Sequence, residues 1–397
     1  MSLLRTRGWN NCCDIDVSTK VAHKRRLGKV RRYDVDSCWI FCLLFALFIG
    51  VFNGAEGQSL ASARMAQSIS SERGAKVNPP RGVDETQFAK IGEIDQFIAI
   101  RGEDRRNPVI LFLHGGPADA QSPFLQEFVP WERDFTIVNW DQRGSGKTYG
   151  KNGPATPGMD TPVAALDRLT TDAIEVAEYA SQKLEKRKII LVGHSWGAIL
   201  GLNVVKRRPD LFYAFVATGL PVSWKQSLED SETWARREAV SSHDESTLKA
   251  LDEAASLRFD DMRRISASAK YRMTETDLAY LKMQQTAIGP DAPAKGDSAD
   301  WVAGGAFTLP KILPVVFSFD ARTMGTDFSL PIFVLQGRDD HVASFAEAQK
   351  YEGEIRAPRK ALVPISGGHF ACFTNSKEFV EALRSNLLPL VDGVGRK

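Results

Sequence analysis

The sequence predicts an α/β fold, in which helices cover both faces of a mostly parallel sheet and a mainly helical segment is inserted. Apolar strand-like runs alternate with helical stretches through most of the chain, as in parallel sheets covered on both faces. Between Pro221 and Phe328 the alternation stops, and charged, helix-prone sequence replaces it. The 397 residues suffice for one core of this class with an insertion.

The chain divides by composition into five segments. We expect a leader with a signal sequence at 1–57, a flexible linker at 58–83, a core in two parts at 84–220 and 329–397, and a helical cap at 221–328. The strand-like runs that define the core are 97–100, 109–113, 135–140, 188–192, 213–217, 331–336 and 361–365. An apolar stripe at helical spacing predicts a helix over 162–186, and helix-prone stretches in the cap are 246–259 and 274–284.

A serine lies on a predicted strand-to-helix turn. Gly193-His194-Ser195-Trp196-Gly197 follows an apolar run and precedes an apolar helical stretch. A G-x-S-x-G sequence in this context is typical of a nucleophile elbow, where side chains larger than hydrogen at the two glycine positions would collide. The pattern predicts Ser195 as a nucleophile.

A serine nucleophile needs a base, and the base needs a carboxylate to orient it. In elbow-type enzymes the order along the chain is serine, acid, histidine, and only His341 and His369 of the six histidines follow Ser195 with an acid between. His341 directly follows the candidate acids, and adjacent residues of an extended loop point apart, so His369 is the predicted base. Spacing alone leaves Asp339 and Asp340 both open as the acid.

Acyl transfer also needs donors for the oxyanion. One is the backbone N–H of Trp196, the residue after the nucleophile. The run 109–113 ends in His114-Gly115-Gly116-Pro117, where two glycines let the backbone approach a substrate oxygen closely. The second donor is therefore assigned to Gly116 or Gly115, whereas we expect His114 and the segment Asp141–Lys147 to brace the loops.

Four motifs together resemble one family. His114–Pro117, Asp141–Lys147, Gly193–Gly197 and Gly337-Arg338-Asp339-Asp340 occur in the order typical of α/β-hydrolases of the proline iminopeptidase type. The resemblance implies the α/β-hydrolase fold and Asp340 as the acid. Ala118 departs from the family, which usually has a further glycine there.

The resemblance implies a serine hydrolase that forms an acyl-enzyme, most simply an aminopeptidase acting on a small or short-peptide substrate with a free amino terminus, with proline first as one possibility. A carboxylesterase for small apolar esters would use the same machinery, and a non-catalytic binding protein on this fold is a third reading. Dehalogenases and epoxide hydrolases place aspartate at the elbow, so the serine disfavours both.

The cap offers candidates for the substrate pocket. Its aromatic residues are candidate pocket lining, and its acids are candidate partners for a substrate ammonium, although none aligns clearly with the family's amine-binding acids. The aromatic candidates are Trp224, Trp234, Trp301, Phe307, Phe317 and Phe319; the acids are Glu229, Asp230, Glu232 and Glu238.

The leader predicts export. Basic residues from Lys24 to Arg32 precede an apolar run at 38–52, which would span about 22 Å as a helix, short of the bilayer's roughly 30 Å hydrocarbon core. We expect cleavage and a periplasmic or secreted protein, with an anchor formed by residues 38–52 as the alternative.

Charge and cysteine content exclude several partners. The formal net charge of +2 argues against nucleic acid, and a membrane contact is expected only through an uncleaved leader. Four of five cysteines lie in the leader, leaving Cys372 without a partner. No Cys or His cluster has zinc spacing, so no metal or cofactor is expected.

Overall fold

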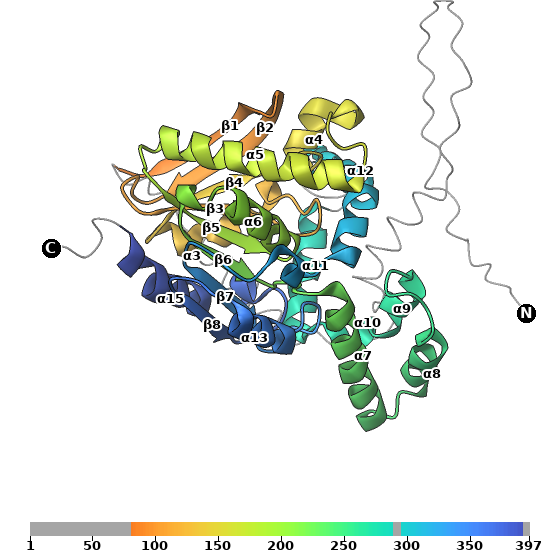
Figure 1. Cartoon of the computed structure of the whole chain (residues 1–397). Helices are drawn as coiled ribbons and strands as arrows, with labels where there is room; N and C mark the ends of the chain where they lie inside the picture. Colours follow the sequence, from red (N-terminus) through yellow and green to blue (C-terminus); the bar gives the residue numbers. More distant parts are fainter. Residues whose placement is uncertain (1–80, 289–294, 392–397) are drawn as a thin grey trace, which may run out of the picture.

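An eight-stranded sheet forms the centre of the molecule, for which a computed structural model describes residues 81–288 and 295–391 (Figure 1). The strand order is β1-β2-β4-β3-β5-β6-β7-β8. The strands are β1 Val83–Ile91, β2 Ile94–Gly102, β3 Val109–Leu113, β4 Thr136–Trp140, β5 Ile189–His194, β6 Phe212–Thr218, β7 Ile332–Gly337 and β8 Lys360–Ile365. The pairs β1–β2 and β2–β4 are antiparallel and all others parallel, which confirms the predicted, mostly parallel sheet.

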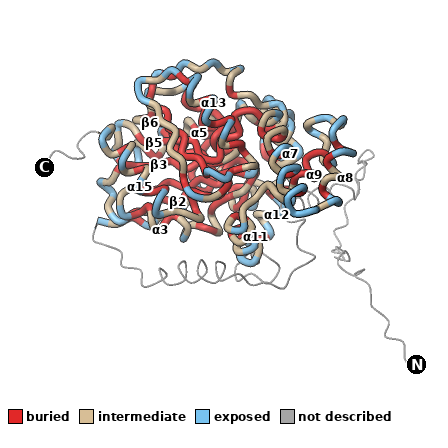
Figure 2. Tube along the Cα trace, turned by 90° about the horizontal axis from the view of Figure 1, so that it is seen from below, coloured by how far each residue is buried: buried red, intermediate tan, exposed pale blue. Residues whose placement is uncertain are grey.

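The central strands are buried on both faces, as their continuous apolar sequences require. All five residues of β3 are buried. Successive side chains of a strand point to opposite faces, so Leu111 and Leu113 join one hydrophobic cluster while Ile110 and Phe112 join the other. Figure 2 shows the buried residues concentrated along these strands.

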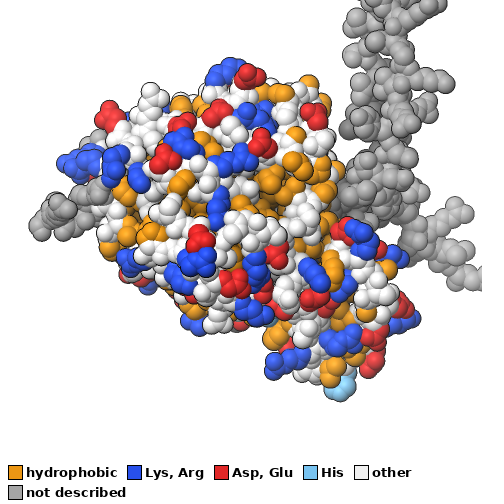
Figure 3. Space-filling view, viewed as in Figure 1, with side chains coloured by type: hydrophobic (Ala, Val, Ile, Leu, Met, Phe, Trp, Pro, Cys, Tyr) orange, Lys and Arg blue, Asp and Glu red, His pale blue; other side chains and the backbone are white. Residues whose placement is uncertain are grey.

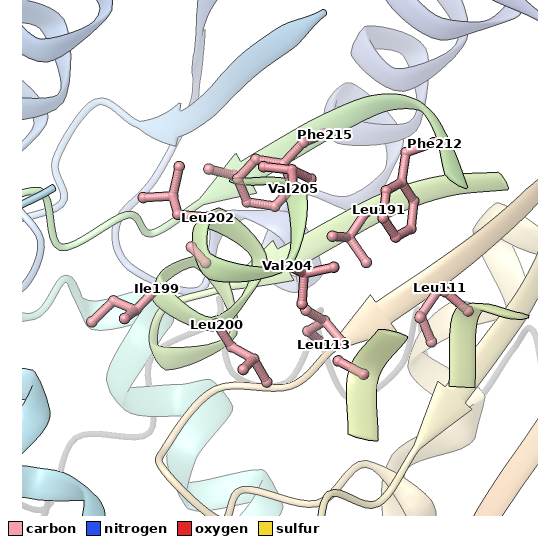
Figure 4. Packing of buried hydrophobic residues seen from close by; sticks show 14 of the residues in the cluster. Leu111, Leu113, Leu191, Ile199, Leu200, Leu202, Val204, Val205, Phe212 and Phe215 are labelled. Atoms are coloured by element: carbon pink, nitrogen blue, oxygen red, sulfur yellow. The ribbon is translucent and has the colours of Figure 1, made fainter. Parts of the chain in front are cut away.

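Helices cover both faces of the sheet. Residues of α5 (Pro162–Lys183), α6 (Trp196–Arg207) and α13 (Phe345–Glu354) pack in the cluster that contains Leu111. Figure 4 shows α6 side chains such as Leu200 and Val204 against β3, β5 and β6. Residues of η1 (Ser122–Phe128), α3 (Val129–Glu132), α14 (Ala371–Thr374) and α15 (Ser376–Leu387) pack in the opposite cluster.

The structure adds one strand that the sequence reading did not include. β1 pairs with β2 along its full length and begins at Val83, which the sequence analysis assigned to the linker. Its sequence VDETQFAKI contains three charged residues, and several positions are exposed, as at the edge of a sheet. The predicted leader, the run at 38–52 and linker residues 58–80 lie outside the described residues.

Residues 221–328, here called the helical insertion, connect β6 to β7 and contain six described α-helices. They are α7 Trp224–Ser241, α8 Glu245–Ala254, α9 Met262–Ala267, α10 Ala269–Arg272, α11 Glu275–Ile288 and α12 Lys295–Ser318. The Asp244 side chain caps α8, which ends five residues before the predicted 259. Helices α7 and α8 project away from the sheet at the lower right of Figure 1.

Helix α12 is the most apolar element of the insertion. Residues Gly296–Ser318 are long and apolar enough to cross a membrane by length and composition alone, a property that core helices of soluble proteins share. In this structure α12 packs against α4 (Gly146–Asn152), α5 and α7. Figure 3 shows hydrophobic side chains gathered over α12, whereas acidic and basic side chains alternate elsewhere on the same face.

Candidate active site

Ser195 occupies a strained turn between β5 and α6. Its φ of +54° and ψ of −118° are unusual for a residue with a side chain. Surrounding hydrogen bonds hold the turn: the Ser195 N–H donates to the Thr218 carbonyl at 2.9 Å, and the Ala198 N–H donates to the Ser195 carbonyl at 2.8 Å. Strain of this kind persists where the neighbouring structure fixes the backbone. The turn therefore has the elbow geometry that the sequence predicts.

The two glycines of the motif allow the strand and the helix to approach. A Cβ atom on Gly193 would collide with the Gly197 carbonyl, and one on Gly197 would collide with the Leu113 carbonyl on β3. Backbone atoms of a central sheet cannot move aside cheaply. Gly193 and Gly197 are therefore required by close packing.

Replacing Gly197 by alanine is expected to lower the free energy of unfolding by about 1–3 kcal/mol, because the new methyl group overpacks the junction of α6 and β3. Urea unfolding of the purified protein measures the loss. Gly353→Ala is the matched control, since that α13 glycine has no atom within 4 Å of a built Cβ and no positive φ. Equal stability of the two variants would contradict this packing account.

Three side chains from distant parts of the sequence converge beside the elbow. His369 Nε2 lies 3.0 Å from Ser195 Oγ, and His369 Nδ1 lies 3.0 Å from Asp340 Oδ2. A carboxylate only accepts hydrogen bonds, so Nδ1 donates to Asp340 and Nε2 of the neutral ring is left to accept from the serine. This is the relation that a serine nucleophile, its base and an orienting acid require.

The structure distinguishes the two candidate acids. Asp340 is 1% exposed, and its Oδ1 accepts from the N–H groups of Val342 and Ala343 at 3.0 and 2.8 Å. Asp340 Oδ2 also accepts from Gln336 Nε2 at 2.8 Å. Asp339 is exposed. Of the two carboxylates, Asp340 is the one that contacts His369.

His341, the rejected base candidate, has a different environment. Its ring stacks on Trp234 of α7, with the ring centroids 4.3 Å apart. Burial lowers the pKa of His341.

Opposing effects set the protonation of His369. Burial lowers the pKa of the His369 ring, but the charge and hydrogen bond of Asp340 and the charge of Asp277 raise it by more, so the net pKa is above 6.5. The charge of Arg272 lowers the pKa of His369, but by less than the two carboxylates raise it. The ring is neutral, and able to accept a proton, only above this raised pKa.

Two further histidines brace the site in neutral form. Burial lowers the pKa of His194 to about 3 and that of His114 to about 4. The His194 Nε2–H donates to the His369 carbonyl at 3.0 Å, which ties the elbow to the His369 loop. His114 Nε2 accepts from the Gln142 N–H at 3.1 Å.

The segment Asp141–Lys147 braces the surrounding loops. Asp141 accepts hydrogen bonds from Ser122 and from the Lys147 N–H. The guanidinium of Arg143 pairs with Asp172 through bonds of 2.6 and 3.0 Å, with both side chains fully buried. Neither Asp141 nor Arg143 lines a cavity that reaches Ser195.

The predicted oxyanion donors border Ser195. Trp196 begins α6, and its indole Nε1–H donates to Gln142 Oε1 at 3.0 Å. Gly115 lies against the elbow, because a Cβ atom built on it would be 3.2 Å from Ser195 Cβ. Gly116 is exposed, lines the cavities on both sides of Ser195, and its N–H donates to no acceptor within the described chain. Gly116 thus has an unused donor.

Sequence reasoning missed Asp277, a fully buried carboxylate of α11. Its Oδ2 accepts from the His369 N–H at 3.1 Å, and its Oδ1 accepts from the Phe370 N–H at 3.0 Å. The helical insertion thereby holds the backbone of the His369 loop. In the structure this contact also accounts for Gly368, because a Cβ there would collide with the Asp277 carboxylate.

Asp277→Asn is expected to lower kcat/KM by about 10- to 100-fold, because the amide presents only one acceptor to the two N–H groups, and hydrogen bonds to charged groups contribute about 1.5–3 kcal/mol. Loss of its charge also lowers the pKa of His369, so the acid limb of the rate profile moves to lower pH. Asp252→Asn, at an exposed ion pair on α8, is the control. If the pH dependence of kcat/KM is the same in Asp277→Asn and the wild type, Asp277 acts only on the structure and not on the pKa of His369.

Two small cavities flank Ser195. The first has a volume of about 140 Å³, and its lining includes the polar residues Asp119, His194 and Gln284. The other lining residues are mainly apolar, such as Leu281 and Leu309. The second, of about 110 Å³, contains Trp224, Arg272 and Phe317 among its lining. Gly116, Ser195, His369 and Leu313 border both. A substrate carbonyl at Ser195 would therefore have one space on each side.

Only part of the predicted pocket lining contacts these cavities. Trp301 lines the first cavity, and Trp224 and Phe317 line the second, whereas Trp234, Phe307 and Phe319 line neither. None of the four candidate acids of α7 lines either cavity. Asp230 accepts from Ser344, and Glu232 forms an ion pair with Arg264. A substrate ammonium in the cavities would not meet these acids.

Comparisons with known proteins identify the family to which this fold belongs. A family model described as the alpha/beta hydrolase fold matches residues 108–376. The Bacillus subtilis protein named "Probable aminopeptidase YbaC" is 28% identical over 279 residues, which cover 68% of this chain and 85% of that protein. The proline iminopeptidase of Neisseria gonorrhoeae is 31% identical over 137 residues, covering 34% and 39% respectively.

A solved structure gives the same fold. The crystal structure of the proline iminopeptidase of Mycobacterium smegmatis superposes with a TM-score of 0.53 at 18% identity, covering 78% of this chain and 98% of that one. Its likeness concerns the fold alone.

Proposed function

The chain belongs to the α/β-hydrolase fold family, and from this premise we propose that it is a serine hydrolase, most specifically an aminopeptidase of the proline iminopeptidase type. The observation that carries the proposal is the contact of His369 Nε2 with Ser195 Oγ at 3.0 Å, with Asp340 on the opposite ring nitrogen. The names of the relatives support the aminopeptidase assignment.

In the proposed mechanism, Ser195 Oγ attacks the substrate carbonyl carbon while His369 Nε2 takes its proton. The N–H groups of Trp196 and Gly116, with Gly115 as the alternative to Gly116, stabilise the oxyanion. The C–N bond then breaks, and the imidazolium gives its proton to the departing amine. Water, deprotonated by His369, then attacks the acyl-enzyme. The bond between the acyl carbon and Ser195 Oγ breaks, His369 returns the proton to Oγ, and the acid is released. Asp340 keeps Nδ1 protonated throughout.

A panel of substrates tests the proposal. Aminoacyl arylamides with alanine or proline first, and short aryl esters, are each assayed with the wild type and with Ser195→Ala. Arylamide turnover that depends on Ser195 supports the aminopeptidase. No arylamide turnover together with fast ester turnover would overturn it.

One observation favours a carboxylesterase as the second candidate. The side chains around the first cavity are mainly apolar, which suits small apolar esters. Robust turnover of esters without any amino group, at rates above those of the matching aminoacyl esters, would select this alternative.

We also propose export, on the basis of the basic segment from Lys24 to Arg32 followed by the apolar run 38–52. Amino-terminal sequencing of the protein recovered from cell fractions tests it. A mature terminus near Gln58 outside the cytoplasm supports cleavage, an intact chain in the membrane fraction supports the anchor, and an intact chain in the cytoplasm contradicts both.

A further inference from the structure

The first cavity holds a carboxylate without a partner. Asp119 follows the Gly116-Pro117 turn and lines the cavity, and its carboxylate has no hydrogen bond or ion pair with any described residue. No Lys or Arg is among the described residues that line this cavity. Burial raises the pKa of Asp119 to about 6, so the group is mostly ionised at neutral pH. An ionised carboxylate in apolar surroundings is costly unless a cation or donor meets it.

A second unused acceptor lies in the same cavity. Gln284 of α11 is 5% exposed, and its Nε2 donates to Tyr280 Oη at 2.8 Å. Tyr280 Oη in turn donates to Glu127 Oε2 at 2.7 Å. This network fixes the amide orientation, and Gln284 Oε1 accepts from no described residue. Asp119 and Gln284 thus present acceptors to the space beside Ser195, whose lining also includes Gln285.

The second cavity holds the opposite charge. Arg272 of α10 lines it and is bonded through Nε to Ser231 and through Nη2 to Ser268 and the Ile265 carbonyl. Within the described residues these hydrogen bonds use Nε and Nη2, and no carboxylate forms an ion pair with Arg272. Burial lowers the pKa of Arg272 to about 10, so the guanidinium is still charged at neutral pH. Glu232 acts on Arg272 only through its charge, without an ion-pair contact. Opposite charges thus lie in the two cavities that meet at Ser195.

We propose that the two cavities bind a short free peptide as a zwitterion, with its terminal ammonium at Asp119 and Gln284 and its carboxylate at Arg272. In such a peptide, one carbon atom separates the amino group from the scissile carbonyl. A substrate whose ammonium lies in the first cavity can therefore place this carbonyl beside Ser195. The departing amino acid then lies in the second cavity. The simplest substrate that carries both terminal charges next to one scissile bond is a dipeptide. This inference rests on the proposed function and specifies its substrate.

Three peptides test both charges separately: Ala-Ala, Ala-Ala amide, which lacks the carboxylate, and propionyl-Ala, which lacks the ammonium. Asp119→Asn should raise KM about 10- to 100-fold for the first two and leave propionyl-Ala, the poorest wild-type substrate, nearly unchanged. Arg272→Gln should raise KM similarly for Ala-Ala and propionyl-Ala but not for the amide. Arg272→Lys, which keeps the charge, should restore part of the loss.

The controls separate failure of the inference from failure of the proposed function. Asp230→Asn, an insertion acid outside both cavities, should leave KM unchanged. Equal effects of Asp119→Asn on all three peptides, or of Arg272→Gln on peptide and amide alike, would overturn the inference while the aminopeptidase stands. If no peptide is cleaved, alanine phenyl ester and phenyl propionate still test Asp119: an Asp119→Asn effect confined to the alanine ester supports the ammonium subsite, and equal effects refute it.

Discussion

Replacing Ser195 by alanine is expected to lower kcat by about 10⁶-fold, the size of loss seen when a serine nucleophile of this kind is removed. Ser195 Oγ is the attacking atom in the proposed mechanism, and among the described residues it is the hydroxyl that contacts His369 Nε2, at 3.0 Å. The substitution removes only one oxygen, so the fold and substrate binding should persist. Steady-state kinetics on the best ester or arylamide measures the loss of kcat and any change in KM. Urea unfolding of the same variant measures the stability of the fold.

Ser385→Ala, at an exposed position of α15, is the matched control and should retain full activity. A Ser195→Ala protein that is folded and keeps more than about one hundredth of the activity would contradict a serine nucleophile, since residual catalysis over water comes only from the oxyanion donors and substrate binding.

Asp340→Asn is expected to lower kcat by about 10⁴-fold, because an amide at this position no longer holds the proton on Nδ1 of His369. The ring can then adopt the tautomer in which Nε2 carries the proton and cannot accept from Ser195. Asp339→Asn, at the exposed neighbour, should change kcat by no more than a few-fold. Parallel kinetics of the two variants measures the difference, and equal losses would refute the acid assignment.

The same variant changes the pH dependence. Although burial lowers the pKa of His369, Asp340 raises it by more, so the wild-type acid limb of kcat/KM should lie above pH 6.5. Activity falls as pH drops through this pKa because the protonated ring cannot act as a base. Asp340→Asn removes the raising charge, and the acid limb of its residual activity should move to lower pH. An acid limb unmoved by the substitution would contradict the coupling.

The central strands and the serine, histidine and acid loops could be predicted because local sequence determines them. β3 and β5 are continuous apolar runs, and the elbow needs two glycines at a fixed spacing around Ser195. The choice of Asp340 over Asp339 depended on a family resemblance, because adjacent residues of a loop have equal spacing to His369. Only the fold shows which carboxylate is turned inward.

The remaining features depend on contacts between distant segments. Asp277 lies 92 residues before His369, so no local pattern links the two. The acids of α7 had suitable chemistry, but Asp230 and Glu232 turned out to be engaged elsewhere, whereas Asp119 belongs to the loop assigned to the oxyanion. The sequence analysis did not include β1 because the polar and charged residues of this edge strand leave no apolar run.

The most direct test of the central claim is covalent labelling by a fluorophosphonate, which reacts with an activated serine. We expect one adduct per protein molecule, located by peptide mass mapping on the segment that contains Ser195, and none in Ser195→Ala. Labelling should weaken as pH falls through the raised pKa of His369. A folded wild-type protein that stays unlabelled, or that is labelled at another residue, would contradict the assignment and favour a non-catalytic binding role.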